Sequence, residues 1–184
     1  MKQRVIPRSV RDLLLVTPCL TRPTGHLHGV SLKVLSAARD VNHLLAERLV
    51  EKIAQALDSV ENKEVGILGL AFKPNTNSVA GSSSLRLAER LVSKGAHVRA
   101  YDPVAISEAK VHLNGSVRYC DSAYAAAEGS DALVVGTGWP EFRALDFDRI
   151  KHLLRKPVIV DTKNLLDAAR LRALGFEYVG VGRG

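Results

Sequence analysis

Residues 65–101 read VGILGLAFKPNTNSVAGSSSLRLAERLVSKGAHVRAY and decide the fold. The stretch begins with a short apolar run at 65–68 and passes through a polar loop. A helical pattern follows at 84–94, and a second apolar run closes the stretch at 98–101. A strand, a helix and a second strand in this order are the repeating unit of a parallel sheet.

The same alternation continues to the end of the chain. Further strands are expected at 117–119, 132–135, 158–160 and 178–181, with helical segments at 106–113, 122–128, 147–154 and 165–173. Six strands separated by helices predict an α/β fold: a Rossmann-like, mostly parallel sheet with helices on both faces.

A long helix is expected before this domain. Residues 31–57 contain no glycine or proline and carry apolar residues three or four apart. Such a helix would span about 40 Å, longer than a small domain needs, so its apolar stripe is expected to pair two copies of the chain. We therefore divide the sequence into a basic arm at 1–28, a dimerisation helix at 29–60 and a Rossmann-like domain at 61–184.

The composition excludes several classes of protein. With 46% apolar and 24% charged residues among 184, the chain has the balance of a globular protein and not of a disordered one. Two cysteines, Cys19 and Cys120, are too few for a disulfide scaffold, and no apolar run approaches the length of a membrane span. These features favour a reducing, cytoplasmic setting without a membrane partner. The six histidines form no metal-ligand cluster, so no metal site is expected.

The net charge of +7 is concentrated near the N-terminus. Residues 1–40 hold seven basic and two acidic side chains, and the rest of the chain is nearly neutral. Such an arm is either a transit peptide or the edge of a larger protein. Nucleic-acid binding is not expected, because aromatic residues make up only 5% of the chain.

The loop after the first strand is the candidate ligand site, because parallel sheets bind ligands beyond the carboxyl ends of their strands. It has neither the G-x-G-x-x-G spacing nor the GxxxxGK[ST] pattern. It offers Phe72 and Lys73, followed by Ser82, Ser83 and Ser84, any of which could cap a helix whose free amides favour an anion. The alternatives are a solvated loop lysine at Lys73 and a core aromatic at Phe72.

Several motifs in order resemble the UDP-glucose/GDP-mannose dehydrogenase family. They are VGILGLAFKPNT, HVRAYDPVA, GWPEF, VIVDTKN and LGFEYVGVGRG, with VN in the preceding helix. The resemblance covers about residues 29–184 and is specific because the pieces occur in combination. It implies the C-terminal, nucleotide-sugar-binding domain of enzymes that oxidise a nucleotide sugar with NAD.

The resemblance also implies roles for individual residues. Phe72, Lys73 and Lys163 would bind the UDP part of a UDP-sugar, with Lys163 in place of an arginine. It would keep the positive charge but lose the planar fork of that side chain. Five further matching residues are interpreted as fold-setting: Gly69, Pro74, Asp102, Trp139 and Asn164. The residues assigned to the homodimer helix are Asn42, Leu45, Arg48, Leu49 and Ile53.

The sequence departs from the family pattern in two places. After FKPNT the family usually continues D-D-x-R-E-S, whereas residues 77–82 here read NSVAGS, with Ala80 in place of the arginine associated with the cofactor. Around Cys19 only a faint echo of the catalytic G-x-C-x-P-K-D remains. No catalytic residue is therefore assigned, and Cys120 is interpreted as an ordinary core or surface thiol.

These observations leave two function classes open. In the first, the chain is the C-terminal portion of a UDP-glucose 6-dehydrogenase-like enzyme, inactive alone, because a G-x-G-x-x-G motif for NAD is missing from the sequence. In the second, it is a non-catalytic module that binds nucleotides or assembles through its helix. UDP is the expected ligand, and NAD is not expected to bind the isolated chain productively.

Overall fold

The strands form a single sheet in which all pairs are parallel. The computed structural model describes residues 33–113 and 115–182, without the side chains of 34–36, 38, 39, 42 and 43. Six strands lie in the order β3-β2-β1-β4-β5-β6. Their bounds are β1 Glu64–Leu68, β2 His97–Tyr101, β3 Val117–Tyr119, β4 Ala132–Val135, β5 Val158–Asp161 and β6 Glu177–Gly180. Each lies within one residue of its predicted position, so the predicted fold class is confirmed.

The burial of the strands follows from their place in the sheet. In β1 all residues after Glu64 are buried, as are all residues of β4 and β5, because helices cover both faces of the central strands. In β2 and β6, nearer the edges, buried residues alternate with less buried ones. Continuous apolar runs thus mark the centre of the sheet.

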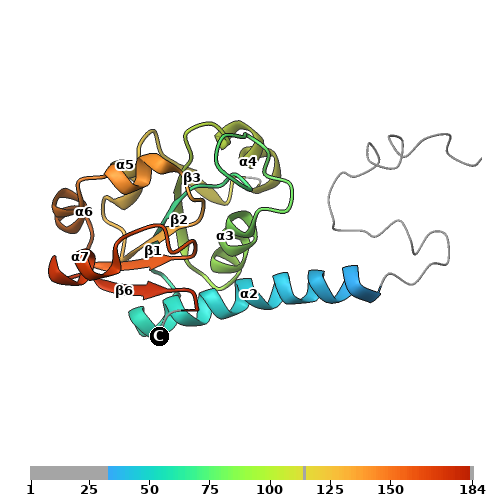
Figure 1. Cartoon of the computed structure of the whole chain (residues 1–184), viewed down its shortest axis with the longest axis horizontal. Coiled ribbons are helices and arrows are strands. Elements are labelled where there is room, and N and C mark those ends of the chain that lie inside the picture. The colour runs from blue at the N-terminus through green and yellow to red at the C-terminus, as the bar shows by residue number, and fades with distance from the viewer. Residues whose placement is uncertain (1–32, 114, 183–184) are drawn as a thin grey trace, which may run out of the picture. The chain divides into compact units, whose positions relative to one another are not determined.

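The helices between the strands cover the two faces. They are α3 Ser83–Ser93, α4 Ile106–Leu113, α5 Ala123–Ala127, α6 Phe147–Leu153 and α7 Ala168–Ala173, with a 3₁₀ turn, η2, at Pro140–Ala144. Right-handed crossovers place α3 and α4 on one face and α5, α6 and α7 on the other. Figure 1 shows these two groups on opposite sides of the domain.

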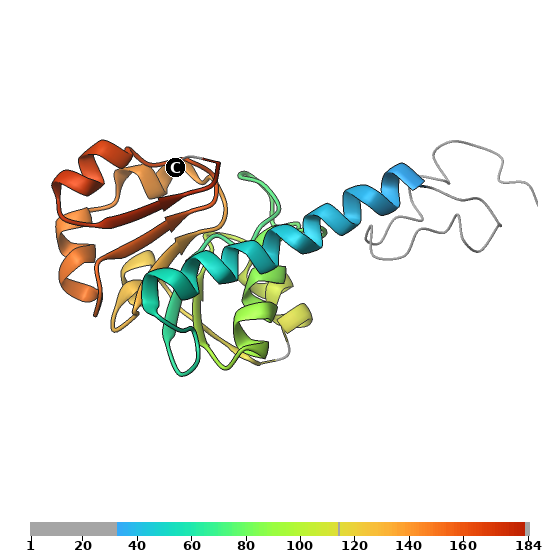
Figure 2. The ribbon, with the colours of Figure 1, turned by 90° about the horizontal axis from the view of Figure 1, so that it is seen from below.

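The long helix α2 spans Lys33–Leu57. The chain divides into two units, Met1–Asp40 and Val41–Gly184, and most of α2 belongs to the second. There Glu47 pairs with Arg90 of α3 at 2.9 Å, and Lys52 donates to the carbonyl of Gly180 at 3.3 Å. The second half of α2 therefore lies beside α3 and near β6, on the part of the sheet that α3 and α4 leave uncovered (Figure 2).

This packing narrows the surface that α2 can offer to a partner. Leu49 and Ile53, assigned from the sequence to a dimer contact, are buried in the core of their own domain. The sequence pattern did not reveal this, because one apolar stripe serves either kind of contact. Leu45 and Arg48 are exposed, the Asn42 side chain is not described, and the arm at 1–28 lies outside the described residues.

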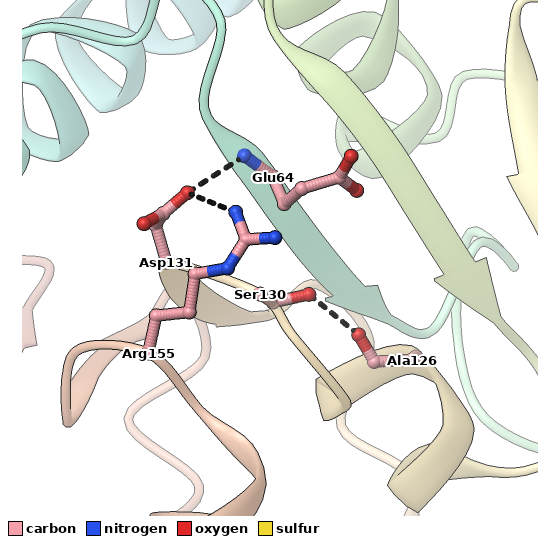
Figure 3. Close-up of polar contacts among 5 residues, drawn as sticks. All are labelled: Glu64, Ala126, Ser130, Asp131 and Arg155. Carbon is pink, nitrogen blue, oxygen red and sulfur yellow. Dashed lines mark hydrogen bonds and ion pairs between the residues drawn. The ribbon is translucent and has the colours of Figure 1, made fainter.

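Polar contacts hold the amino ends of three strands together. Oδ2 of Asp131, just before β4, accepts a hydrogen bond from the backbone amide of Glu64 at 2.9 Å. Arg155, just before β5, pairs with the same oxygen at 3.6 Å (Figure 3). Ser130 beside them donates to the carbonyl of Ala126 at the end of α5. The polar groups at this edge bind one another, so the carboxyl edge is the better candidate for a ligand site.

Within the ranges 33–113 and 115–182, none of the helices combines the length and the apolar character that crossing a membrane requires.

Candidate functional site

The strand order reverses between β1 and β4, and the loops that follow these two strands touch. From β1 the chain proceeds through β2 to β3 on one side, and from β4 through β5 to β6 on the other. A Cβ added to Gly69, after β1, would lie 2.5 Å from Cβ of Thr137. A Cβ added to Gly136, after β4, would lie 2.4 Å from Oγ of Ser84 and 2.7 Å from the carbonyl oxygen of Gly69. Only glycine permits this approach, which brings the first residues of α3 to the reversal point.

Asp102, at the end of β2, fixes the start of the candidate loop. Its Oδ2 accepts hydrogen bonds from the amides of Leu70 and Ala71 at 2.7 and 2.9 Å, and from the Trp139 indole at 3.2 Å. The other oxygen, Oδ1, accepts from the amides of residues 104 and 105 at 3.0 and 2.8 Å. With five donors and an exposure of 1%, this carboxylate has no surface left for a ligand. The fold-setting interpretation of Asp102 and Trp139 is confirmed.

Phe72 and Lys73 lie in the loop beyond the carboxyl end of β1, as predicted. The Phe72 side chain is 56% exposed, so the alternative of a core aromatic is wrong. Lys73 is exposed as well, and the structure shows no hydrogen bond or ion pair of its side chain to the described residues. Both side chains are therefore available to a ligand.

Lys163, in the loop after β5, reaches the first residue of α3. Its Nζ donates to Oγ of Ser83 at 3.3 Å, and its backbone amide donates to Oδ1 of Asp161 at 2.9 Å. The residue as a whole is exposed, yet desolvation by the surrounding chain lowers the pKa of Lys163 below the ordinary lysine value. The negative charge of Asp161 opposes part of that shift. The hydrogen bond to Ser83 places the Lys163 side chain where the amides of a helix N-terminus already favour an anion.

The structure decides which serine caps α3. Ser82 accepts from the amides of Ser84 and Leu85, so Ser83 is left beside Lys163. The hydroxyl oxygen of Ser84 is buried and has no hydrogen-bond partner in the part of the chain described. The polar groups at this helix terminus are consequently not all satisfied by the protein itself.

Sequence reasoning missed Asp161 as a supporting residue of the site. It is fully buried, and its Oδ2 accepts from the amide of Leu166 at 2.8 Å and from the hydroxyl of Tyr178 at 3.1 Å. It supports the Lys163 loop much as Asp102 supports the Phe72 loop. The available signal was an aspartate at the carboxyl end of an apolar strand, which both positions share.

Asn164 and the two cysteines complete the predicted residues. Asn164 adopts φ +49° and donates to the carbonyl of Val181 at 2.9 Å, consistent with a fold-setting role. Cys120 is buried, with Sγ 3.9 Å from the carbonyl oxygen of Arg118. Cys19 lies outside the described residues. Among residues 33–113 and 115–182, no three His, Cys, Asp or Glu side chains are grouped so as to hold a metal ion.

This strand order, with a helix N-terminus at its reversal point, defines the class of doubly wound α/β domains that bind ligands at that point. Residues 66–168 match the model of the UDP-glucose/GDP-mannose dehydrogenase family, UDP binding domain. The chain therefore belongs to the UDP-glucose/GDP-mannose dehydrogenase family.

Individual relatives agree with this assignment. The chain is 39% identical to UDP-glucose 6-dehydrogenase TuaD of Bacillus subtilis over 155 residues, which are 84% of this chain and 34% of that protein. It is 38% identical to the UDP-glucose 6-dehydrogenase of Pseudomonas aeruginosa over 183 residues, 96% of this chain and 39% of that protein. The solved UDP-glucose dehydrogenase of Pyrobaculum islandicum matches with a TM-score of 0.71 and 30% identity, over 87% of this chain and 34% of that one. The chain spans between a third and two fifths of the length of these relatives.

Proposed function

We propose that the chain binds the UDP part of a UDP-sugar at the carboxyl edge of its sheet. The observation that carries the proposal is the Lys163 ammonium, 3.3 Å from Ser83 at the N-terminus of α3, where the strand order reverses. A diphosphate would bind between this cation, the helix amides and Lys73. The exposed ring of Phe72 would lie against the base.

The proposed UDP site also suggests a part for this domain in the oxidation of a UDP-sugar. The relatives are UDP-glucose 6-dehydrogenases, and we propose that this domain supplies the nucleotide-binding half of such a substrate site. We assign no NAD site to these residues, because the sequence contains no G-x-G-x-x-G motif. In this proposal Lys73 and Lys163 hold and orient the diphosphate and perform no chemistry on the sugar.

Removing either lysine is expected to weaken UDP binding. Lys73→Ala and Lys163→Ala should each raise the Kd for UDP about tenfold. This factor corresponds to the lower end of the free energy expected for a hydrogen bond to a charged group, because both sites are exposed. Isothermal titration with UDP and with uridine measures this. The lysine variants should leave uridine binding unchanged, since uridine carries no phosphate, and Phe72→Ala should weaken both ligands.

Lys94→Ala is the matched control, because Lys94 is an exposed lysine at the opposite end of α3. UDP affinities equal to that of the unaltered chain in both lysine variants would remove these residues from the site.

We also propose that the chain forms a homodimer through the exposed part of α2. Val41, Leu44 and Leu45 are exposed by 55%, 56% and 41%, and their spacing of three and four places them on one helix face. An exposed apolar stripe of this kind commonly pairs with its copy about a two-fold axis.

A charge on this stripe is expected to produce a monomer. Leu45→Asp should shift the molecular mass measured by analytical ultracentrifugation from that of a dimer to that of a monomer at about 20 µM, because a buried unpaired carboxylate is costly. Val111→Asp is the control, since Val111 is 75% exposed and lies on α4, a different helix. A monomeric parent chain would refute the dimer, as would an unaltered dimer in Leu45→Asp.

A further inference from the structure

The tip of the ligand loop, residues 72–78, is closed on itself and exposed. The amide of Phe72 donates to the carbonyl of Ser78 at 2.9 Å, and the amide of Ser78 donates to Oγ1 of Thr76 at 3.1 Å. Phe72, Lys73, Asn77 and Ser78 are all exposed. Internal bonds of this kind fix the shape of the tip but not its direction relative to the sheet.

One side chain connects this tip to another element. Nδ2 of Asn77 donates a hydrogen bond to Oε1 of Glu108 in the first turn of α4. In the described part of the chain, this is the hydrogen bond that joins residues 72–78 to anything outside their own loop. A contact across 31 residues of sequence therefore helps to set the direction in which Phe72 and Lys73 are presented.

The environment of Glu108 favours this contact. The side chain is half-buried, and its second oxygen, Oε2, is enclosed and has no hydrogen-bond partner among the described residues. The bond from Asn77 is therefore the hydrogen bond that this carboxylate has to the described residues. Its place in the first turn of α4 also favours a negative charge.

Both ends of the contact are attached to the same anchor. Oδ2 of Asp102 holds the amides at the base of the loop, and Oδ1 holds the amide of Ala105, directly before α4. The loop base and the start of α4 are thus fixed relative to each other. The two ends of the tip are also held, because Ala71 and Val79 on either side of it are buried in the core. The contact between Asn77 and Glu108 adds an attachment at the tip itself, which restricts how far residues 72–78 can move about these ends.

We propose that Asn77 and Glu108 form a latch that positions the Phe72 and Lys73 side chains for the nucleotide; this rests on the proposed UDP site. Both are positioning residues, because neither needs to touch the ligand. An amide suits position 77, since it donates to a carboxylate that an aspartate would repel.

Hydrogen exchange of the ligand-free chain tests the latch without any nucleotide. Glu108→Ala should speed exchange of the Phe72 and Ser78 amides about fivefold, because the loop opens more often once the attachment at its tip is lost. Glu108→Gln keeps an acceptor oxygen and should exchange like the parent chain. Asn77→Asp should exchange faster, and adding Glu108→Gln to it should restore slow exchange, because the glutamine amide then donates to the new carboxylate.

UDP titration of the same variants tests the link to binding. Glu108→Ala and Asn77→Asp should weaken UDP about fivefold, while Glu108→Gln and the double variant should bind within about twofold of the parent. A role limited to global stability would not follow this pattern of rescue, and thermal unfolding should be nearly equal across the set because the contact lies at the surface. Glu89→Ala, an exposed acid on α3, is the control.

The outcomes separate the latch from the UDP site. If the parent chain binds no UDP, the proposed function fails, and the exchange rates still decide whether the latch exists. Unchanged exchange in Glu108→Ala overturns the latch whether or not UDP binds. Faster exchange with unaltered UDP affinity overturns the positioning role of the latch. If Glu108→Gln and Glu108→Ala speed exchange equally, the hydrogen bond is not what holds the loop.

Discussion

Asp102→Ala is expected to lower the free energy of unfolding by about 4 kcal/mol or more, the result of leaving several buried donors unpaired at once. The carboxylate accepts from four backbone amides and from the indole of Trp139, and it is almost completely buried. Alanine leaves all five without an acceptor. Because the stability of a whole domain is about 5–15 kcal/mol, this loss approaches the total.

Urea unfolding followed by circular dichroism measures this effect. Asp102→Asn keeps one acceptor oxygen but turns an amide donor toward the other donors. Its free energy of unfolding should therefore lie between those of the parent chain and of Asp102→Ala. Asp121→Ala, at an exposed aspartate after β3, should unfold within about 0.5 kcal/mol of the parent. A loss below about 1 kcal/mol for Asp102→Ala would mean that water replaces the carboxylate, and the anchor role argued for Asp102 would fall.

The sequence was sufficient to locate the strands because each is a short apolar run bounded by polar or small residues. Burial on both faces leaves β4 and β5 without a polar residue until Asp161, so their limits can be read directly. The helices between them follow from the same alternation. The 3₁₀ turn at Pro140–Ala144 was not predicted, since a single turn with three residues per turn does not show the 3.6-residue period from which helices are predicted.

Which residues of α2 are buried in the domain and which are exposed could not be predicted from periodicity. Leu45, Leu49 and Ile53 recur every four residues, and this spacing specifies a face but not what covers it. The structure places Leu49 and Ile53 in the domain core and leaves Leu45 exposed. The difference arises because α3 and α4 cover only part of their face of the sheet, which is a property of the strand order.

The candidate site was predicted in its residues but not in its geometry. The position of Phe72 and Lys73 follows from the rule that parallel sheets bind ligands at the carboxyl ends of their strands. Whether Ser82, Ser83 or Ser84 caps α3 depends on backbone angles that three identical residues do not reveal. The bond between Asn77 and Glu108 joins elements that only the β1–β2 crossover brings together.

Gly69→Ala is expected to destabilise the domain by about 3 kcal/mol, through two effects that add. Gly69 has φ +93°, a conformation that costs an alanine about 1–2 kcal/mol. The new Cβ would also lie 2.5 Å from Cβ and 2.7 Å from the amide nitrogen of Thr137, and overpacking of this kind typically costs about 1–3 kcal/mol. The Thr137 backbone is itself held by its amide, which donates to the carbonyl of Leu68 at 3.3 Å, so it cannot easily move away.

Two other glycines separate the backbone effect from the steric one. Gly115 has φ +75° and open space around a Cβ, so Gly115→Ala should lose only the conformational share, about 1–2 kcal/mol. Gly138 has open space and no positive φ, so Gly138→Ala should be close to neutral or slightly stabilising. If urea unfolding gives Gly69→Ala the same loss as Gly115→Ala, the loops after β1 and β4 can separate at little cost. Their contact would then not be what brings the N-terminus of α3 to the reversal point, and a nucleotide site there would need another support.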